Sequence, residues 1–154
     1  MKKIKFPKTK TASKAKLKTS LNRLEKNFGS PLPKEYVKFV EQHNGARPDD
    51  LIVVIKKKYE IGVSFFIPVR NILSTKKGIE GFPEEGFPIA GDDGGNYFYL
   101  NKLDSRIYFW DHEVEDGDVF LAKTFAEFLL KIKKFDKSKI NFSDSDTIIV
   151  CCFF

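Results

Sequence analysis

The spacing of apolar residues predicts two helices in the first third of the chain. The first helix has an apolar stripe of period 3.6 and a natural end near Gly29. Its stripe consists of Leu17, Leu21, Leu24 and Phe28. The second helix begins around Pro33, which suits a first helical turn, and ends at Asn44 and Gly45. Its inward-facing residues are Tyr36, Val37, Phe39 and Val40. We expect these helices to form one layer against a sheet.

Beyond residue 50 the pattern changes to short β-branched and aromatic runs, which are typical of strands. Residues 51–55 and 61–67 form the first two runs, and Pro68 closes the second. Glycine and proline are too frequent in residues 72–86 for a long helix. We therefore predict a surface loop there, with one turn of helix.

The clearest pattern is an antiparallel meander over residues 87–111. Three aromatic runs, 87–90, 97–100 and 106–111, are separated by the turn sequences GDDGGN and NKLDS. Because side chains alternate along a strand, the last two runs have two distinct faces. One face carries Phe98, Leu100, Ile107 and Phe109, and the other carries Tyr97, Tyr99, Tyr108 and Trp110. One face should pack on the core, and we expect Trp110 to be buried.

A second acidic turn, HEVEDGD, is followed by a predicted strand over residues 119–122 and by one more helix. Thr124 and Glu127 have the spacing of a capping box, so this helix should run to about Lys133. Its buried stripe is Phe125, Phe128, Leu129 and Ile132. The order of elements predicts an α+β fold, with a mainly antiparallel β-sheet flanked by N-terminal helices and by one helix in the C-terminal half.

Composition is that of a single soluble domain. The 154 residues are 42% hydrophobic and include 16 Phe, enough for a core without disulfides or metal. A loop over residues 136–146 should precede a final strand around 148–150, in which the adjacent Cys151 and Cys152 act as small apolar side chains. The ending CCFF matches a prenylation signal only in the position of its first cysteine. No segment resembles a signal peptide or a membrane span, so we expect a cytoplasmic protein.

The formal net charge of +6 is distributed unevenly along the chain. Between Met1 and Lys26 there are ten basic residues and one acidic residue, whereas between Glu84 and Asp118 there are two basic and ten acidic residues. We predict a basic flexible arm over residues 1–10, followed by one domain that occupies the rest of the chain, residues 11–154. The acidic middle argues against nucleic acid as the partner, because nucleic-acid binding needs a basic face.

Several segments resemble the SUKH superfamily, specifically its Smi/Knr cell-wall assembly regulator branch. The segment LPKEYVKFVEQHNG is similar to the family's helix that starts with Leu-Pro and ends with Asn-Gly. The segments FPIAGDDGGNYFYLN and RIYFWDHE are similar to its central acidic turn and aromatic strands, and TFAEFLLKI matches the end of its pattern. These segments occur in the family's order and extend from about Leu17 to Ile132.

This resemblance implies an α+β fold and a non-enzymatic role. Bacterial members of the superfamily commonly act as immunity proteins, which bind and neutralise a cognate polymorphic toxin, often a nuclease. The implied partner is therefore a toxin protein, bound through its C-terminal toxin domain. The fungal relatives imply an alternative, a scaffold or regulatory interaction module without a toxin partner.

Candidate catalytic and metal-binding residues form no recognised pattern. The two histidines, His43 and His112, lack the spacing of a metal site with Cys151 and Cys152. The turn at residues 92–96 lacks the alternating ligands and closing Glu of a calcium loop, and its carboxylates would repel a phosphate. We therefore predict no catalytic residue, no cofactor and no metal, and we interpret this segment as a hairpin turn.

The candidate binding residues are the carboxylates of the acidic turns and the tyrosines beside them. Nuclease toxins are basic because they hold a polyanion, so an acidic face would steer such a partner and select it. We expect exposed tyrosines to act as anchors among these carboxylates. The predicted surface consists of Asp92, Asp93, Tyr97, Tyr99, Tyr108, Asp111, Glu113, Glu115, Asp116 and Asp118. An equally open interpretation is that the acids only solvate their turns.

A competing hypothesis assigns the function to the basic N-terminal arm and first helix. Phe6 and Pro7 suit a flexible arm, and lysines opposite the apolar stripe make the helix amphipathic. Such a segment suits nucleic acid or an anionic surface. Against this hypothesis, the core needs the same apolar stripe, and runs of lysine usually serve solubility.

Overall fold

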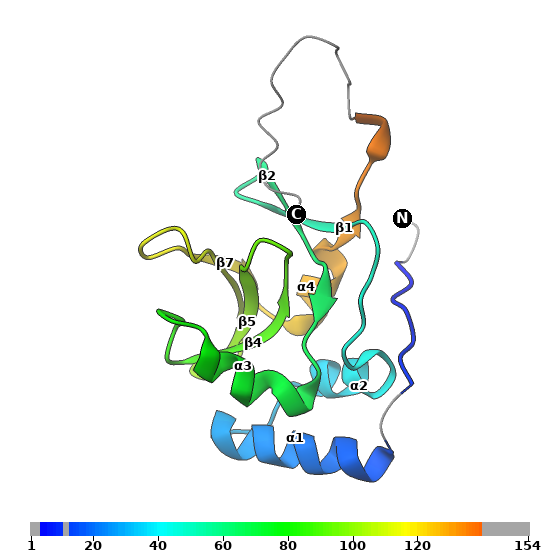
Figure 1. Cartoon of the computed structure of the whole chain (residues 1–154), viewed down its shortest axis with the longest axis vertical. Coiled ribbons are helices and arrows are strands. Elements are labelled where there is room, and N and C mark those ends of the chain that lie inside the picture. Colours follow the sequence, from blue (N-terminus) through cyan, green and yellow to red (C-terminus); the bar gives the residue numbers. More distant parts are fainter. Residues whose placement is uncertain (1–3, 11–12, 140–154) are drawn as a thin grey trace.

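The structure is a computed structural model and describes residues 4–10 and 13–139. This part of the chain contains four α-helices and two antiparallel sheets, the α+β fold that the sequence predicts (Figure 1). None of its helices is long and apolar enough to cross a membrane. The predicted final strand at 148–150, Cys151, Cys152 and most of the predicted loop at 136–146 lie outside the described residues.

Helices α1 (Lys14–Phe28) and α2 (Lys34–His43) confirm the two predicted N-terminal helices. The Ser13 side chain caps α1 at its start, and Gly29 ends it with a left-handed φ of 83°. The apolar stripes of both helices face the core, as the periodicity predicts. Their buried residues are Leu17, Leu24, Phe28, Tyr36, Phe39 and Val40, with Leu21 and Val37 half-buried at the margin.

The smaller sheet has three strands in the order β2-β1-β8. Its members are β1 (Leu51–Ile55), β2 (Tyr59–Gly62) and β8 (Lys133–Lys134). The larger sheet has five strands in the order β3-β4-β5-β6-β7. Its members are β3 (Phe65–Phe66), β4 (Gly86–Gly91), β5 (Tyr97–Asn101), β6 (Ile107–Trp110) and β7 (Asp118–Ala122). The predicted meander is therefore confirmed as β4, β5 and β6.

Two sequence predictions were wrong in this region. The run at 61–67 is not one strand, because Ile61 pairs with β1 in the small sheet while Phe65 pairs with β4 in the large one. Residues 72–86 hold more than one turn of helix: α3 (Ile72–Gly78) follows the 3-10 helix η1 (Val69–Asn71). The first six residues of α3 contain neither glycine nor proline. The glycines and proline that suggested a loop lie at the end of this helix and after it.

Helix α4 (Phe125–Lys131) begins at the predicted cap. The Thr124 hydroxyl oxygen accepts the backbone N–H of Glu127, and the Glu127 carboxylate accepts the backbone N–H of Lys123. The bond from the Lys123 backbone N–H, together with the bond from Lys131, lowers the pKa of the Glu127 carboxyl. The helix ends before the predicted Lys133, because residues 133 and 134 pair with β1 as strand β8. A short 3-10 helix, η2 (Lys137–Lys139), closes the described chain.

The two faces of the large sheet are covered in different ways. On the inner face, Phe98, Leu100, Ile107 and Phe109 are buried in the core. Helix α4 covers this face, with ring centroids of Phe98 and Phe128 5.4 Å apart. On the outer face, Phe82 from the segment before β4 lies 5.5 Å from Tyr99 and 5.3 Å from Trp110, centroid to centroid. Trp110 is therefore buried, as predicted, but under Phe82 instead of in the main core.

The N-terminal segment, residues 4–10, lies along the domain beside α2 (Figure 1). The ring of Phe6 packs 5.3 Å from that of Phe39, centroid to centroid. The carbonyl oxygen of Pro7 lies 2.9 Å from Nδ1 of His43. This part of the predicted flexible arm thus has defined contacts, because its one aromatic residue reaches the core.

Candidate functional site

The two acidic turns meet at one end of the large sheet. The β4–β5 turn (92–96) and the β6–β7 turn (111–117) share that end because β4 to β7 run antiparallel in sequence order. Oδ1 of Asn96 accepts the backbone N–H of His112 at 3.1 Å and lies 2.8 Å from Nδ1 of that histidine. The side chain of Asn96 therefore joins the two turns, and the structure brings together the acids that the sequence places apart. We call this the acidic end.

The β4–β5 turn is held by its own first carboxylate. Asp92 accepts the backbone N–H groups of Gly94 and Asn96, both at 2.9 Å, and the side-chain amide of Asn96. Gly95 has a φ of 91°, which favours glycine. This segment is therefore a hairpin turn, as predicted. The side chain of Asp92 is half-buried and stabilises the turn through these hydrogen bonds. Asp93 is exposed and accepts the hydroxyl of Ser64 at 2.8 Å.

The β6–β7 turn is tight and presents three exposed acids. Asp111 is half-buried and accepts the backbone N–H of Glu113 at 3.0 Å. A Cβ at Gly117 would lie 2.6 Å from the carbonyl oxygen of Asp111, so only glycine fits there. Glu113, Glu115 and Asp116 are exposed, and no hydrogen bond or ion pair in the described part of the chain uses their carboxylates.

Tyr99 is not the exposed anchor that the sequence analysis predicts. Its side chain is only 3% exposed, because the ring of Phe82 covers it. Its hydroxyl donates a 2.8 Å hydrogen bond to the carboxylate of Asp118, the first residue of β7. Burial and this bond raise the pKa of Tyr99 above its ordinary value. Tyr99 therefore positions Asp118, and its buried ring is not an exposed anchor.

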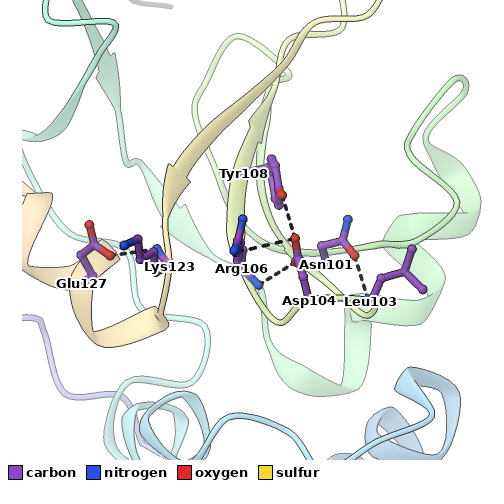
Figure 2. A network of polar contacts seen from close by, with 7 residues as sticks. All are labelled: Asn101, Leu103, Asp104, Arg106, Tyr108, Lys123 and Glu127. Carbon is purple, nitrogen blue, oxygen red and sulfur yellow. Dashed lines mark hydrogen bonds and ion pairs between the residues drawn. The ribbon is translucent and has the colours of Figure 1, made fainter.

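The other two predicted anchors are half-buried. Tyr97 packs between Phe82 and Trp110, with centroids 6.2 and 6.4 Å away. Tyr108 stacks on Tyr99 at 5.4 Å, and its hydroxyl donates to Asp104 at the opposite end of β6 (Figure 2). Burial and that bond raise the pKa of Tyr108. These two rings offer a partner only part of their surface.

The acidic end has no compensating cations of its own. Residues 91–96 and 111–118 contain no Lys or Arg. Within the described residues, none of the ion pairs involves its carboxylates, and the nearby acids that are paired, Glu85 and Asp104, lie toward the other end of the strands. Five carboxylates of the acidic end are exposed: Asp93, Glu113, Glu115, Asp116 and Asp118. The arrangement suits attraction of a basic surface.

Two exposed apolar side chains at this surface were not predicted from the sequence. Phe120 on β7 is 47% exposed and Val114 in the β6–β7 turn is 53% exposed. The alternation of β7 carries the signal for Phe120, since Val119 and Leu121 both face the core and Phe120 must face away. In the described ranges, no group of three or more His, Cys, Asp and Glu side chains is arranged to hold a metal ion.

Comparisons with known proteins match the part of the chain that forms this surface. A family model of the SUKH group, described as SMI1-KNR4 cell-wall, matches residues 18–129. The chain is also similar to the SPbeta prophage-derived uncharacterized protein YokK of Bacillus subtilis (strain 168). The two are 27% identical over 138 residues, which cover 73% of this chain and 72% of that protein. The segment that the family model matches contains both acidic turns.

Proposed function

Because the chain belongs to the SMI1-KNR4 cell-wall family of the SUKH superfamily, we propose that it is an immunity protein that binds and neutralises a cognate toxin. The family includes toxin-immunity proteins. The observation that carries the proposal is the acidic end, where five exposed carboxylates lie on or beside two joined turns and form no ion pair with any residue that the structure describes. Neutralisation is by contact, and the chain performs no chemistry on the toxin.

The charge of this surface indicates a basic toxin surface as its target. A nuclease must be basic where it holds its polyanionic substrate. Like charges held together repel each other in the free chain, and a basic partner removes that repulsion on binding. Occupying the toxin's substrate-binding surface would exclude nucleic acid from it. Because exposed charges are screened beyond about 8 Å at physiological salt, the association rate should fall as salt is raised.

The test starts with capture of the partner. The tagged chain is incubated with nuclease-treated lysate of the source cell at low and high salt, and the retained protein is identified. That protein is then expressed in a host, with and without this chain. Growth arrest by the retained protein alone, relieved by co-expression, is the expected result. A retained protein that is harmless when expressed alone contradicts the proposal.

A charge-reversal pair locates the contact on the acidic end. Asp93→Lys with Glu113→Lys should weaken binding of the retained toxin by about tenfold to a hundredfold, because close charge pairs at interfaces couple by roughly 1.5 kcal/mol or more. The matched control, Asp49→Lys with Glu80→Lys, makes the same change in net charge at two exposed acids outside the turns. Equal affinity of both double variants would place the contact elsewhere.

A second candidate function rests on the basic side of the molecule. A hollow formed by α1, η1 and α3 is lined by Thr19, Ser20, Arg23 and Arg70 together with the apolar Leu24, Val69 and Leu73, and its two guanidinium groups suit an anion. Lys5, Lys8 and Lys10 are exposed in the N-terminal segment, whereas Phe6 of that segment is packed. Changing these three lysines to Gln keeps that packing and tests the charge. Salt-sensitive binding of a DNA duplex that the triple variant loses would favour this function.

A further inference from the structure

We propose that the open edge of β7 receives an extended, cationic segment of the partner protein as an additional strand. The inference rests on the proposed function for the class of partner and adds which part of this chain the partner's backbone contacts. Three features of the edge carry it: unpaired backbone, an exposed aromatic ring and unpaired carboxylates.

Strand β7 is the last strand of the large sheet. It pairs with β6 on one side, and no strand of the described chain pairs with its other side. The ammonium group of Lys131 donates a hydrogen bond to the carbonyl oxygen of Leu121, so a side chain, and not another strand, satisfies this backbone group. Among the described residues, no side chain hydrogen-bonds to the backbone of β7 before Leu121. An uncovered edge offers a ladder of backbone donors and acceptors to an extended peptide.

Phe120 gives this edge an apolar contact surface. Its ring lies 5.8 Å from that of Tyr108, centroid to centroid, and the guanidinium carbon of Arg106 lies 5.8 Å from its centre. The ring is held on the outer face and remains 47% exposed. Aromatic side chains, Phe among them, are enriched at the core of protein–protein interfaces. A strand added to β7 would place every second side chain on this face, beside Phe120.

The charge at the start of β7 selects a cationic segment. Glu115, Asp116 and Asp118 lie at or before the first residue of the strand, and all three are exposed and form no ion pair within residues 4–10 and 13–139. The edge strand β2 of the small sheet provides an internal comparison. It exposes Tyr59 to 53%, but Lys56, Lys57 and Lys58 precede it. The two edges thus offer similar apolar contacts and opposite charge, so a cationic segment should prefer β7.

The test uses two synthetic peptides of equal charge, blocked at both ends. The first alternates lysine and valine over eight residues and can form a strand; the second replaces each valine by proline, which removes those backbone donors. Backbone amide shifts of the isotope-labelled chain are followed by NMR during titration. We expect the lysine–valine peptide to bind at least tenfold more tightly than the lysine–proline peptide, with shifts centred on residues 118–122.

Two variants assign the preference to this edge. Phe120→Arg should abolish the difference between the peptides, because it removes the apolar contact and repels lysine. Tyr59→Arg, a matched change at the exposed ring of β2, should leave the difference intact. Equal binding of the two peptides, shifts centred on another strand, no binding, or dimerisation of the free chain through β7 would each overturn the inference. Failure of the proposed function would be seen separately in the co-expression test. There, the retained protein would not be toxic, or this chain would not relieve its toxicity.

Discussion

The inner and outer faces of the large sheet use the same strands for different purposes. Along β5 and β6, every inward residue is Phe, Leu or Ile, whereas the outward residues between Tyr97 and Trp110 all carry a polar atom. Helices cover the inner face, and its apolar side chains need no hydrogen-bond partner there. The outer face is covered mainly by one ring, Phe82, and two of its tyrosines donate hydrogen bonds to acids at the strand ends. A Tyr layer can therefore be buried and still organise a charged surface.

The largest expected effect tests the inner face. Phe98→Ala should lower the free energy of unfolding by about 3–5 kcal/mol, because the fully buried ring leaves a cavity beside Phe128. The matched variant Phe120→Ala, on the outer face, should cost less than about 1 kcal/mol, since that ring is 47% exposed. Urea unfolding followed by far-UV circular dichroism measures both. Similar losses for the two variants would contradict the contrast between the faces.

An intermediate effect tests how closely the outer layer is packed. Gly86→Ala places a Cβ 2.9 Å from the ring of Tyr99 and 3.0 Å from that of Phe82, so we expect a loss of about 1–3 kcal/mol. The control Gly78→Ala adds the same methyl group at the end of α3, where nothing lies within 4 Å. Thermal unfolding should show a lower Tm for Gly86→Ala alone. An unchanged Tm would contradict close packing of the aromatic rings on the outer face.

The smallest effect separates two buried tyrosines. Tyr99→Phe should cost about 0.5–1.5 kcal/mol at neutral pH, because it removes the bond to Asp118. Tyr36→Phe should cost nothing or stabilise, since the buried Tyr36 hydroxyl has no partner within the described residues. Equal losses in urea unfolding at neutral pH would show that the bond to Asp118 contributes nothing.

The same two tyrosines predict an alkaline loss of stability. Burial raises the pKa of both hydroxyls above 10, so their stabilisation is complete below pH 10 and is lost as pH rises beyond it. The loss should be about 1 kcal/mol between pH 10 and 11 for each group, and it approaches about 1.4 kcal/mol per pH unit at higher pH. Either Phe variant should therefore have a shallower decline in unfolding free energy between pH 10 and 11. A decline as steep as that of the unchanged chain would contradict the raised pKa of that group.

The parts of the fold that sequence reasoning predicted are those with a sustained local period. The stripe ending at Phe28 and the alternation around Phe98 depend on neighbours in sequence, and both were confirmed. Strand β8 was missed because Lys133 and Lys134 join β1 through their backbone, which leaves no apolar pattern. The switch of sheets between Ile61 and Phe65 has no local signal either, because it depends on pairing with strands that are distant in the sequence.

The sequence predicted the turns of the candidate site but not which of its side chains are buried. Turn sequences containing Asp92 and Asp111 indicated where the acids lie, and antiparallel pairing brought them together. The burial of Tyr99 depends on Phe82, which lies in a segment rich in glycine and proline and has no periodic pattern. Exposure of a residue on the outer face is thus decided by a loop, and loops are where sequence patterns are weakest.

The pairing of β8 with β1 sets the order in which the chain completes its fold during synthesis. Leu51 pairs with Lys134, so more than half of the chain separates the two partners. At a translation rate of roughly 5–20 residues per second, β1 and β2 wait several seconds on the ribosome before that third strand emerges. The hairpin must persist through this delay with one edge open. The small sheet is therefore completed late, and a nascent chain stalled before residue 133 would lack its third strand.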